Sequence, residues 1–323
     1  MTQQHRLRIV YMGTPDFAVL PLQKMMEAGY EVVGVVTNPD KPAGRGQKLQ
    51  ESAVKRFAVE RGLKVLQPEK FREEDFLREL AGLQADLQLV VAFKMLPEVV
   101  WSMPRLGTVN LHASLLPDYR GAAPINRAVM NGEKVSGVST FLLKHEIDTG
   151  NVIFQERVEI GEDMTAGELH DRLMETGADL LVRTVDAIEA GDYVLTEQET
   201  LLEGREPVHA PKIFKEDMQI DWTKDVDTVY NHIRGLSPFP TAWTVLKNGE
   251  TGETTPLKVY RTRKVTGQGT AEPGTIVSDG RKTLGVCVKG GVIELEELQL
   301  AGKKWMTVAE FLCGFNPDGF SMV

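Results

Sequence analysis

Hydrophobic and polar positions in the first two thirds of the chain follow two alternating patterns. Short apolar runs rich in Val, Ile and Leu predict strands, and longer stretches with apolar residues at helical spacing predict helices. The strands are expected at residues 7–12, 31–37, 64–66 and 86–92, and the helices at residues 17–28, 52–61 and 73–80. Strands that alternate with helices are typical of a doubly wound, mostly parallel α/β sheet of the Rossmann type.

The pattern continues as far as a long helix near residue 190. A short extended run at residues 107–109 comes first, and a helix, an antiparallel strand pair and the long helix follow it. These last elements are expected at residues 123–130, 137–143, 152–158 and 166–190. Thr165 and Glu168 have the spacing of a capping box at the start of the long helix, and Gly191 is expected to end it.

The C-terminal third has a different pattern, with short strands separated by glycine-rich turns. Five strands are expected at residues 244–246, 257–260, 274–277, 284–288 and 292–295. This spacing suggests a small β-barrel of the oligonucleotide-binding (OB) type. A polar stretch at residues 196–209 suits a linker. We therefore expect a first domain at residues 1–195, this linker, and a second domain at residues 210–323.

Composition narrows the class of protein. A length of 323 residues suits two domains. The net charge of −9 argues against indiscriminate binding to nucleic acid, but residues 210–323 carry as many basic as acidic side chains, and a balanced sum can hide a local basic face. The two cysteines do not have the spacing of a metal site or a disulfide framework. Without an apolar targeting segment or a membrane-spanning run, we expect a cytoplasmic protein with no membrane contact.

The first predicted strand ends in Gly13-Thr14-Pro15, which lacks the Gly-x-Gly-x-x-Gly pattern of a dinucleotide site. Nicotinamide binding is therefore disfavoured. Chemistry is more plausible at Asn110 and His112, because residues two apart in a strand project to the same face. An amide can donate to an oxygen that gains negative charge, and an imidazole can carry a proton near neutral pH. By itself, however, such a pair at a strand end more often makes local hydrogen bonds than carries out catalysis.

A long string follows the pair: Ser114-Leu115-Leu116-Pro117, then Tyr119-Arg120-Gly121, and later Asp148-Thr149-Gly150. It resembles the active-site sequence of the folate-dependent formyltransferases. The resemblance implies that Asn110, His112 and Asp148 form a catalytic triad. It also implies an enzyme that takes the formyl group of 10-formyltetrahydrofolate, as a co-substrate, to an amine by direct attack through a tetrahedral intermediate. Neither a metal nor a permanently bound cofactor is expected.

The same resemblance suggests where the folate binds. The segment after the strand at residues 86–92 resembles the backbone clamp for the pterin ring, which places Phe93 and Leu96 at the pocket. Core packing is a near-equal alternative for Phe93. On the other side, the expected folate-binding residues are Ser114, Leu115, Leu116 and Pro117.

Residues 38–49 carry two prolines, two glycines and three basic side chains, which by composition predicts an exposed, mobile connection. The family members that formylate methionyl initiator tRNA for translation initiation have a similar insertion, with Pro-Ala-Gly-Arg-Gly. The resemblance therefore implies that Lys41, Arg45 and Lys48 bind the tRNA. In the barrel, Lys258, Tyr260 and Thr262 are expected to share one strand face and Arg261 and Arg263 the other, although a plain solvated strand explains them equally well.

Two other functions stay open. The same triad could formylate a small amine such as a nucleotide sugar or glycinamide ribonucleotide, against which the 41–48 loop and the barrel argue. The chain could also be an RNA-binding protein with an inactive catalytic half, which the intact triad disfavours. No obligatory protein partner is evident.

Overall fold

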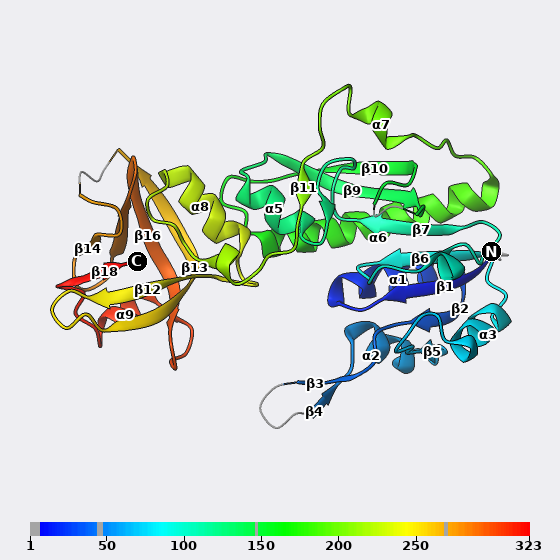
Figure 1. The fold of residues 1–323 in the computed structure, drawn as a ribbon, viewed down its shortest axis with the longest axis horizontal. Helices are drawn as coiled ribbons and strands as arrows, with labels where there is room; N and C mark the ends of the chain where they lie inside the picture. Colours follow the sequence, from blue (N-terminus) through cyan, green and yellow to red (C-terminus); the bar gives the residue numbers. More distant parts are fainter. Residues whose placement is uncertain (1–6, 44–47, 146–147, 268–270) are drawn as a thin grey trace. The chain divides into compact units, whose positions relative to one another are not determined.

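The computed structural model describes residues 7–43, 48–145, 148–267 and 271–323. The chain divides into two compact units, each described here by itself (Figure 1). The first unit comprises residues 1–121, 136–158 and 170–209, and the second comprises residues 122–135, 159–169 and 210–323. No helix in the described ranges has the length and apolar character needed to cross a membrane.

A seven-stranded sheet forms the centre of the first unit, in the order β10-β9-β7-β6-β1-β2-β5. Strand β1 pairs in parallel with β2 and β6, β2 with β5, and β6 with β7, whereas β7 and β9 are antiparallel. The strands are β1 (Arg8–Gly13), β2 (Glu31–Val36), β5 (Val65–Leu66), β6 (Leu87–Val91), β7 (Thr108–His112), β9 (Val135–Leu142) and β10 (Val152–Glu159). The predicted α/β class, with a mostly parallel sheet, is confirmed.

Helices connect these strands near the positions that the sequence predicted. Ser52 caps α2 by accepting a hydrogen bond from Lys55 N at 3.0 Å, and Thr165 and Glu168 form the predicted capping box of α6. The helices are η1 (Asp16–Ala18), α1 (Val19–Glu27), α2 (Ala53–Glu60), α3 (Glu74–Gly82), α4 (Glu98–Trp101), α6 (Ala166–Ala190) and α7 (Gln198–Leu201). Fully buried side chains such as Val10, Met12 and Leu89 place the core on both faces of the sheet.

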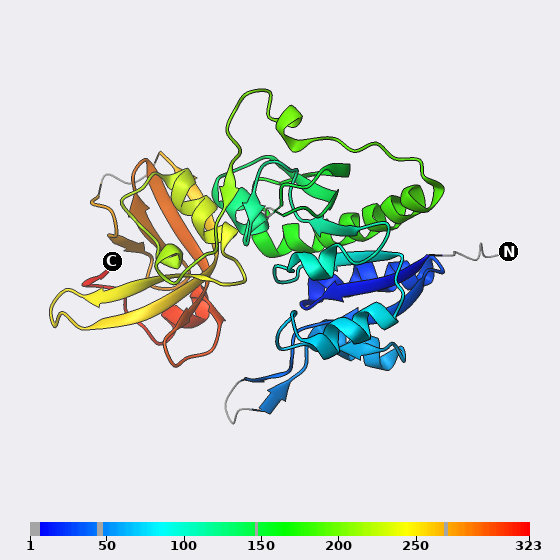
Figure 2. The same ribbon diagram turned by 45° about the vertical axis from the view of Figure 1, so that its right-hand side comes forward.

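The segment predicted as a mobile connection contains two short antiparallel strands, β3 (Lys41–Ala43) and β4 (Lys48–Gln50). Figure 2 shows this hairpin extending from the rest of the first unit. Asp40 anchors its base, because its carboxylate accepts from Lys55 Nζ at 2.5 Å and from Gln67 Nε2 at 2.8 Å. These bonds hold the pKa of the Asp40 carboxyl below its usual value. Composition alone missed the strands because proline and glycine are more common in irregular loops.

The second unit contains an antiparallel sheet in the order β14-β15-β16-β13-β12-β18, with β17 paired to β16. A bridge between Thr275 and Ser321 and a hydrogen bond from Met322 N to Gly274 O at 2.9 Å join the two edges, which curls the sheet into a near-barrel. The strands are β12 (Ala242–Asn248), β13 (Thr254–Thr266), β14 (Ile276–Ser278), β15 (Leu284–Val288), β16 (Gly291–Leu300), β17 (Met306–Thr307) and β18 (Phe320–Met322). The predicted barrel of the OB type is confirmed.

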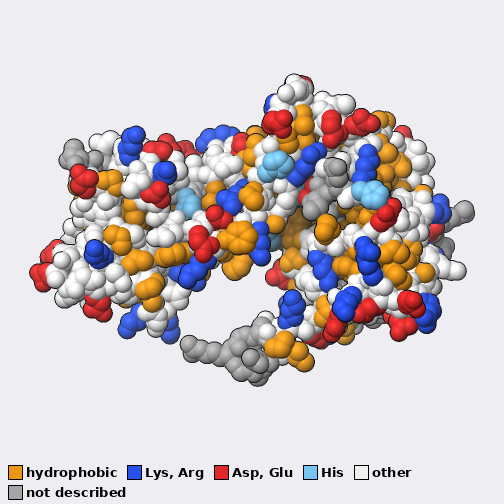
Figure 3. Space-filling view, in the orientation of Figure 1, with side chains coloured by type: hydrophobic (Ala, Val, Ile, Leu, Met, Phe, Trp, Pro, Cys, Tyr) orange, Lys and Arg blue, Asp and Glu red, His pale blue; other side chains and the backbone are white. Residues whose placement is uncertain are grey.

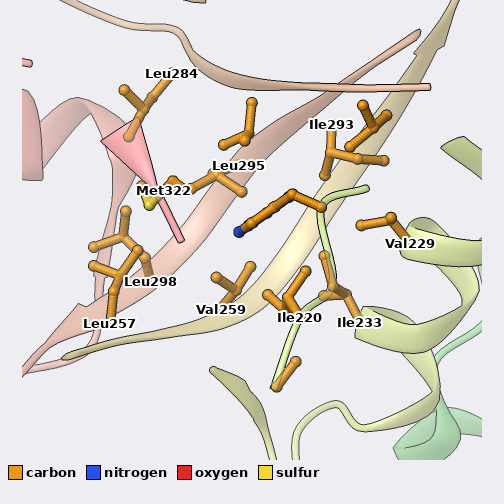
Figure 4. Packing of buried hydrophobic residues seen from close by; sticks show 14 of the residues in the cluster. Ile220, Val229, Ile233, Leu257, Val259, Leu284, Ile293, Leu295, Leu298 and Met322 are labelled. Carbon is orange, nitrogen blue, oxygen red and sulfur yellow. The ribbon is translucent and has the colours of Figure 1, made fainter. Parts of the chain in front are cut away.

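Apolar side chains from the strands fill the centre of this barrel. Figure 4 shows Val259, Leu295 and Leu298 facing Ile220 and Ile233 across the core. The helices of the unit are α5 (Pro124–Met130), η2 (Glu216–Met218), α8 (Val226–Gly235) and α9 (Val308–Leu312). The two-residue strands β8 (Arg120–Gly121) and β11 (His209–Ala210) lie where the chain passes from the first unit to the second.

One strand of the barrel departs from the predicted alternation. The register of β13 against β16 shifts on both sides of Arg261, so Val259 and Tyr260 are both buried although they are adjacent. Lys258 pairs with Gln299, whose side chain accepts from Tyr260 Oη, whereas Thr262 pairs with Leu295 of the barrel core. The expectation that Lys258, Tyr260 and Thr262 share one face is therefore wrong, because a β-bulge resets the alternation of side chains.

The unit boundaries also differ from the expected 1–195 and 210–323. Helix α5 belongs with the second unit, where Asn126 Nδ2 donates to Gly235 O at 2.8 Å. Gly235 itself lies so close to Met130 that a Cβ there would be 2.5 Å from the Met130 side chain. This close α5–α8 contact explains why residues 122–135 pack with chain that follows residue 210.

A buried hydrogen-bond chain gives a test of the barrel core. Trp222 Nε1 donates to Thr244 Oγ1 at 2.8 Å, and Thr244 Oγ1 donates to Val323 O at 3.0 Å. We predict that Thr244→Val lowers the free energy of unfolding by about 1–3 kcal/mol, because it leaves the buried indole N–H without an acceptor. Urea unfolding measures this loss, with the exposed Thr254→Val as the control. Equal stability of the two variants would contradict the assignment.

Candidate active site

Strand β7 brings Asn110 and His112 to one face, as their spacing predicts. The strand lies between β6 and β9, with Asn110 opposite Val90 on one side and Phe141 on the other. His112 is 8% exposed, and Asn110 is partly exposed. Within the described residues the Asn110 side chain has no hydrogen-bond partner, so its amide N–H groups can serve a ligand.

The imidazole of His112 is held by a carbonyl. Its Nε2 lies 2.9 Å from Tyr119 O, and a nitrogen that faces a carbonyl must carry the proton. In the neutral ring Nδ1 is therefore the unprotonated atom. Asp148 Oδ2 lies 3.9 Å from Nδ1, which is an ion-pair distance for a protonated ring but too long for a hydrogen bond. The triad residues come together, while Tyr119 O fixes the ring.

Asp148 lies in a turn with φ of 54°, a left-handed conformation that aspartate tolerates better than most residues. Its Oδ2 accepts from Gly121 N at 3.1 Å. Gly150 must be a glycine, because a Cβ there would lie 1.7 Å from Leu142 O. The turn is thus fixed against both β8 and the end of β9. Glu146 and Ile147, which precede it, lie outside the described residues.

Gln198 supports this turn, a role that the sequence pattern did not predict. The side chain is fully buried, and its Nε2 donates to Asp148 O at 2.8 Å and to Gly150 O at 2.7 Å. Its Oε1 accepts from Arg120 Nε at 2.9 Å and Arg120 Nη2 at 2.7 Å. Arg120 was visible in the motif, but Gln198 falls in the polar stretch that suggested a linker.

Arg205, from the same stretch, forms a second clamp. Its guanidinium makes a two-pronged ion pair with Asp118, with Nη1–Oδ1 of 2.7 Å and Nη2–Oδ2 of 2.5 Å, and Val208 N also donates to Asp118 Oδ1 at 2.9 Å. Burial alone would raise the pKa of the Asp118 carboxyl, but these donors outweigh it and hold the pKa below its usual value. Residues 196–209 are therefore fastened to the loop that follows His112.

The loop that follows His112 is itself pinned to the sheet. Ser114 Oγ donates to Asp118 O at 2.6 Å, and Ser139 Oγ donates to Ser114 O at 2.6 Å. Leu116 and Pro117 are buried, and Leu116 packs in a small core with Phe141. Leu115 is partly buried. Of the predicted folate-binding residues on this side, Leu115 is thus the most open to a ligand.

On the other side of the predicted pocket, Phe93 is partly buried and Leu96 is 7% exposed, and both belong to one apolar cluster. The rings of Phe93 and Phe71 meet edge to face at 5.8 Å. Lys94 Nζ lies 4.5 Å from the centre of the Phe71 ring. Burial and, to a smaller extent, the nearby Lys41 lower the pKa of the Lys94 ammonium.

Two of the three predicted tRNA-binding residues, Lys41 and Lys48, lie in β3 and β4. Lys41 is exposed, and Lys48 lies in β4. Arg45 lies outside the described residues. Figure 3 shows Lys and Arg side chains on the face of the first unit near this hairpin. Among the described residues, no group of three His, Cys, Asp or Glu side chains is placed to hold a metal ion.

Comparison with known families matches both units. A model described as "Formyl transferase" matches residues 7–185, and one described as "Formyl transferase, C-terminal domain" matches residues 212–316. Among curated proteins, the methionyl-tRNA formyltransferase of Bacteroides fragilis is 54% identical over 317 residues, 98% of each chain. Those of Phocaeicola vulgatus and Porphyromonas gingivalis are 56% and 50% identical, covering 96% and 97% of each chain.

Solved structures share the fold at low sequence identity. WlaRD, a sugar 3N-formyl transferase, has a TM-score of 0.63 at 17% identity and covers 93% of this chain and 100% of its own. A variant of HypX from Aquifex aeolicus has a TM-score of 0.64 at 18% identity, over 97% of this chain and 49% of its own. At this identity the likeness concerns the fold alone.

The Gln198 contacts predict a support role that can be measured. We expect Gln198→Ala to reduce kcat by roughly 10 to 10², because a small displacement of a catalytic group is costly, and to lower stability by about 1–3 kcal/mol through the unpaired carbonyls. Gln198→Glu should be similarly impaired, since it keeps the acceptor for Arg120 but loses the donor. Steady-state kinetics and urea unfolding test this, with the exposed neighbour Glu197→Gln as control. A normal kcat in both Gln198 variants would contradict it.

Proposed function

The chain belongs to the formyl transferase family, and on that premise we propose that it transfers the formyl group of 10-formyltetrahydrofolate to the α-amine of methionyl initiator tRNA. The observation that carries the reaction type is the Asn110 amide, unpaired among the described residues, on the same strand as a His112 ring whose Nδ1 lies 3.9 Å from Asp148 Oδ2. The observation that favours this acceptor is the 50–56% identity, over nearly the whole chain, to methionyl-tRNA formyltransferases.

In the first step, the α-amine attacks the formyl carbon and a C–N bond forms. The carbonyl electron pair moves to oxygen, which becomes an oxyanion. The Asn110 amide donates a hydrogen bond to this oxygen, where charge develops only in the transition state and intermediate. Because no protein acceptor among the described residues competes for the amide, it needs no rearrangement before it acts.

Proton transfer follows at His112. Nδ1 accepts the proton that the attacking nitrogen loses, since Nε2 is committed to Tyr119 O. The resulting imidazolium is stabilised by the Asp148 carboxylate. The same proton then passes to N10 of the folate as the C–N10 bond breaks, which releases tetrahydrofolate and the formylated amine. Asp148 stabilises the positive charge of the imidazolium, and Tyr119 O holds the ring in place.

The folate pocket is proposed between the two loops that follow β6 and β7. Phe93 and Leu115 are partly buried and can contact the pterin ring, while the buried side chains of Leu96, Leu116 and Pro117 support the walls. Ser114 is assigned through its backbone, because its hydroxyl is used within the loop. For the tRNA, we propose Lys41, Arg45 and Lys48 together with the barrel. Cytoplasmic translation would supply this acceptor.

Formyl transfer assayed with several acceptors tests the proposal. With 10-formyltetrahydrofolate as donor, charged initiator tRNA should be formylated far faster than charged elongator methionyl-tRNA. An amino sugar nucleotide and glycinamide ribonucleotide should not react. Preferred formylation of either small amine would show that this amine, and not the tRNA, is the acceptor. Absence of transfer to every amine would refute the proposed reaction.

The triad assignment predicts graded losses. His112→Ala should reduce kcat by roughly 10² to 10⁴, the scale for a positioned acid/base. Asn110→Ala should reduce kcat by about 10² to 10³, the scale for loss of one hydrogen-bond donor to an oxyanion. Single-turnover kinetics with saturating donor and acceptor measure both. His170→Ala, a histidine on α6 that contacts Phe17 and Asp171, is the control and should be near normal. Near-normal turnover of His112→Ala would remove this residue from the mechanism.

A further inference from the structure

An aromatic pair on the barrel surface is not explained by packing alone. The rings of Tyr260 and Trp305 are stacked, with centroids 4.2 Å apart and planes 11° from parallel. Tyr260 is 8% exposed, whereas Trp305 is 52% exposed. One face of the indole therefore covers Tyr260, and the opposite face is open to solvent. The open face of the indole is therefore available to a partner.

Hydrogen bonds hold both rings in this position. Trp305 Nε1 donates to Glu297 Oε2 at 3.1 Å, and Tyr260 Oη donates to Gln299 Oε1 at 2.9 Å. Gln299 Nε2 in turn donates to Lys303 O at 2.9 Å, which ties the turn before Trp305 to the same network. The polar atoms of both rings are thus used within the barrel. What Trp305 offers to a partner is a flat apolar face, already oriented.

Lysines lie next to this aromatic pair in the sequence and across the sheet. Lys303 and Lys304 directly precede Trp305, and both are exposed. Lys258 is the cross-strand partner of Gln299, so it emerges on the same side of the sheet as the network. Across the described ranges none of these three lysines forms an ion pair. Arg261, by contrast, lies 3.7 Å from Glu296 and is partly neutralised.

A flat aromatic face beside unpaired cations fits a nucleic acid better than a protein. A nucleobase can stack on the indole, and adjacent phosphates can pair with the lysines. Stacking on an aromatic ring needs a base that is not already stacked on both sides, which points to an unpaired or terminal nucleotide. A protein partner would be expected to need a wider apolar surface and acidic residues to match the lysines.

We propose that the Tyr260–Trp305 pair is a stacking platform for an unpaired base of the acceptor RNA, with Lys258, Lys303 and Lys304 binding the neighbouring phosphates. The platform rests on the proposed function for the identity of the RNA. It gives the barrel a specific binding surface, formed by β13, β16 and the turn before β17. The formyl-transfer chemistry does not involve these residues, so the platform acts on acceptor binding alone.

Steady-state kinetics of the full-length enzyme separate an effect on tRNA binding from effects on catalysis or folate binding. Trp305→Ala should raise the KM for charged initiator tRNA by about tenfold, the scale for losing one base–aromatic stack. The kcat at saturating tRNA and the KM for 10-formyltetrahydrofolate should stay unchanged. Trp305→Phe should recover most of the tRNA affinity, because a ring is restored. Thermal unfolding of each variant confirms that the barrel remains folded.

A lysine variant provides an independent arm, since surface lysines can be changed with little risk to folding. The double variant Lys303→Ala/Lys304→Ala should weaken tRNA binding and reduce the slope of log affinity against log salt by about 1 to 2. Lys289→Ala removes an exposed lysine just before β16 begins at Gly291, at the opposite end of that strand from Leu300, and is the matched control. It should leave the KM and the slope unchanged.

The outcomes are distinguishable from failure of the proposed function. Absence of formyl transfer by the unchanged enzyme would refute the function. If the unchanged enzyme is active, a normal KM for tRNA in both Trp305→Ala and the double lysine variant overturns the platform. A raised KM for folate in Trp305→Ala would also overturn it, because the effect would then not be specific to the RNA.

Discussion

The hydrogen bond between His112 Nε2 and the carbonyl of Tyr119, at 2.9 Å, is the constraint on which the rest of the site depends. It commits Nε2 to the backbone and leaves Nδ1 as the nitrogen of the neutral ring that can accept a proton. The carbonyl can accept this bond only if the loop between His112 and Tyr119 returns to the strand end. Tyr119 adopts φ of 60° to make that return, and the buried hydroxyls of Ser114 and Ser139 hold the loop on the sheet. The fold therefore specifies the tautomer as well as the position of the imidazole.

Three chain segments must coincide for this geometry to persist. The loop after β7 supplies the carbonyl, the turn at Asp148 supplies the carboxylate, and the segment from Gln198 to Val208 fastens both. Gln198 holds the Asp148 turn, and Arg205 holds Asp118. Each bond replaces water on a buried or half-buried polar group, and such groups are costly when left unpaired. The site is thus held by backbone carbonyls and long polar side chains rather than by apolar contacts alone.

The local sequence pattern was sufficient to predict the sheet and the placement of Asn110 and His112 on one strand face. Both follow from the two-residue period of side chains within single strands. The resemblance to the formyltransferases suggested Asp148 as the third residue of the site. The support by Gln198 could not be read from the chain, because it depends on a contact 48 to 50 residues away and its neighbours are as polar as those of a linker. The bulge at Tyr260 and the β3–β4 hairpin were missed for a related reason: each depends on pairing between strands, which composition does not report.

The protonation of His112 tests this account most directly. Nitrogen-15 NMR of the imidazole distinguishes a protonated from an unprotonated ring nitrogen, and a spectrum of His112→Asn identifies the signals that belong to this residue. The account predicts that, in the neutral ring, Nε2 carries the proton and Nδ1 does not. A neutral ring protonated at Nδ1 would contradict it, because Tyr119 O could then not accept the hydrogen bond and the base would face the wrong way.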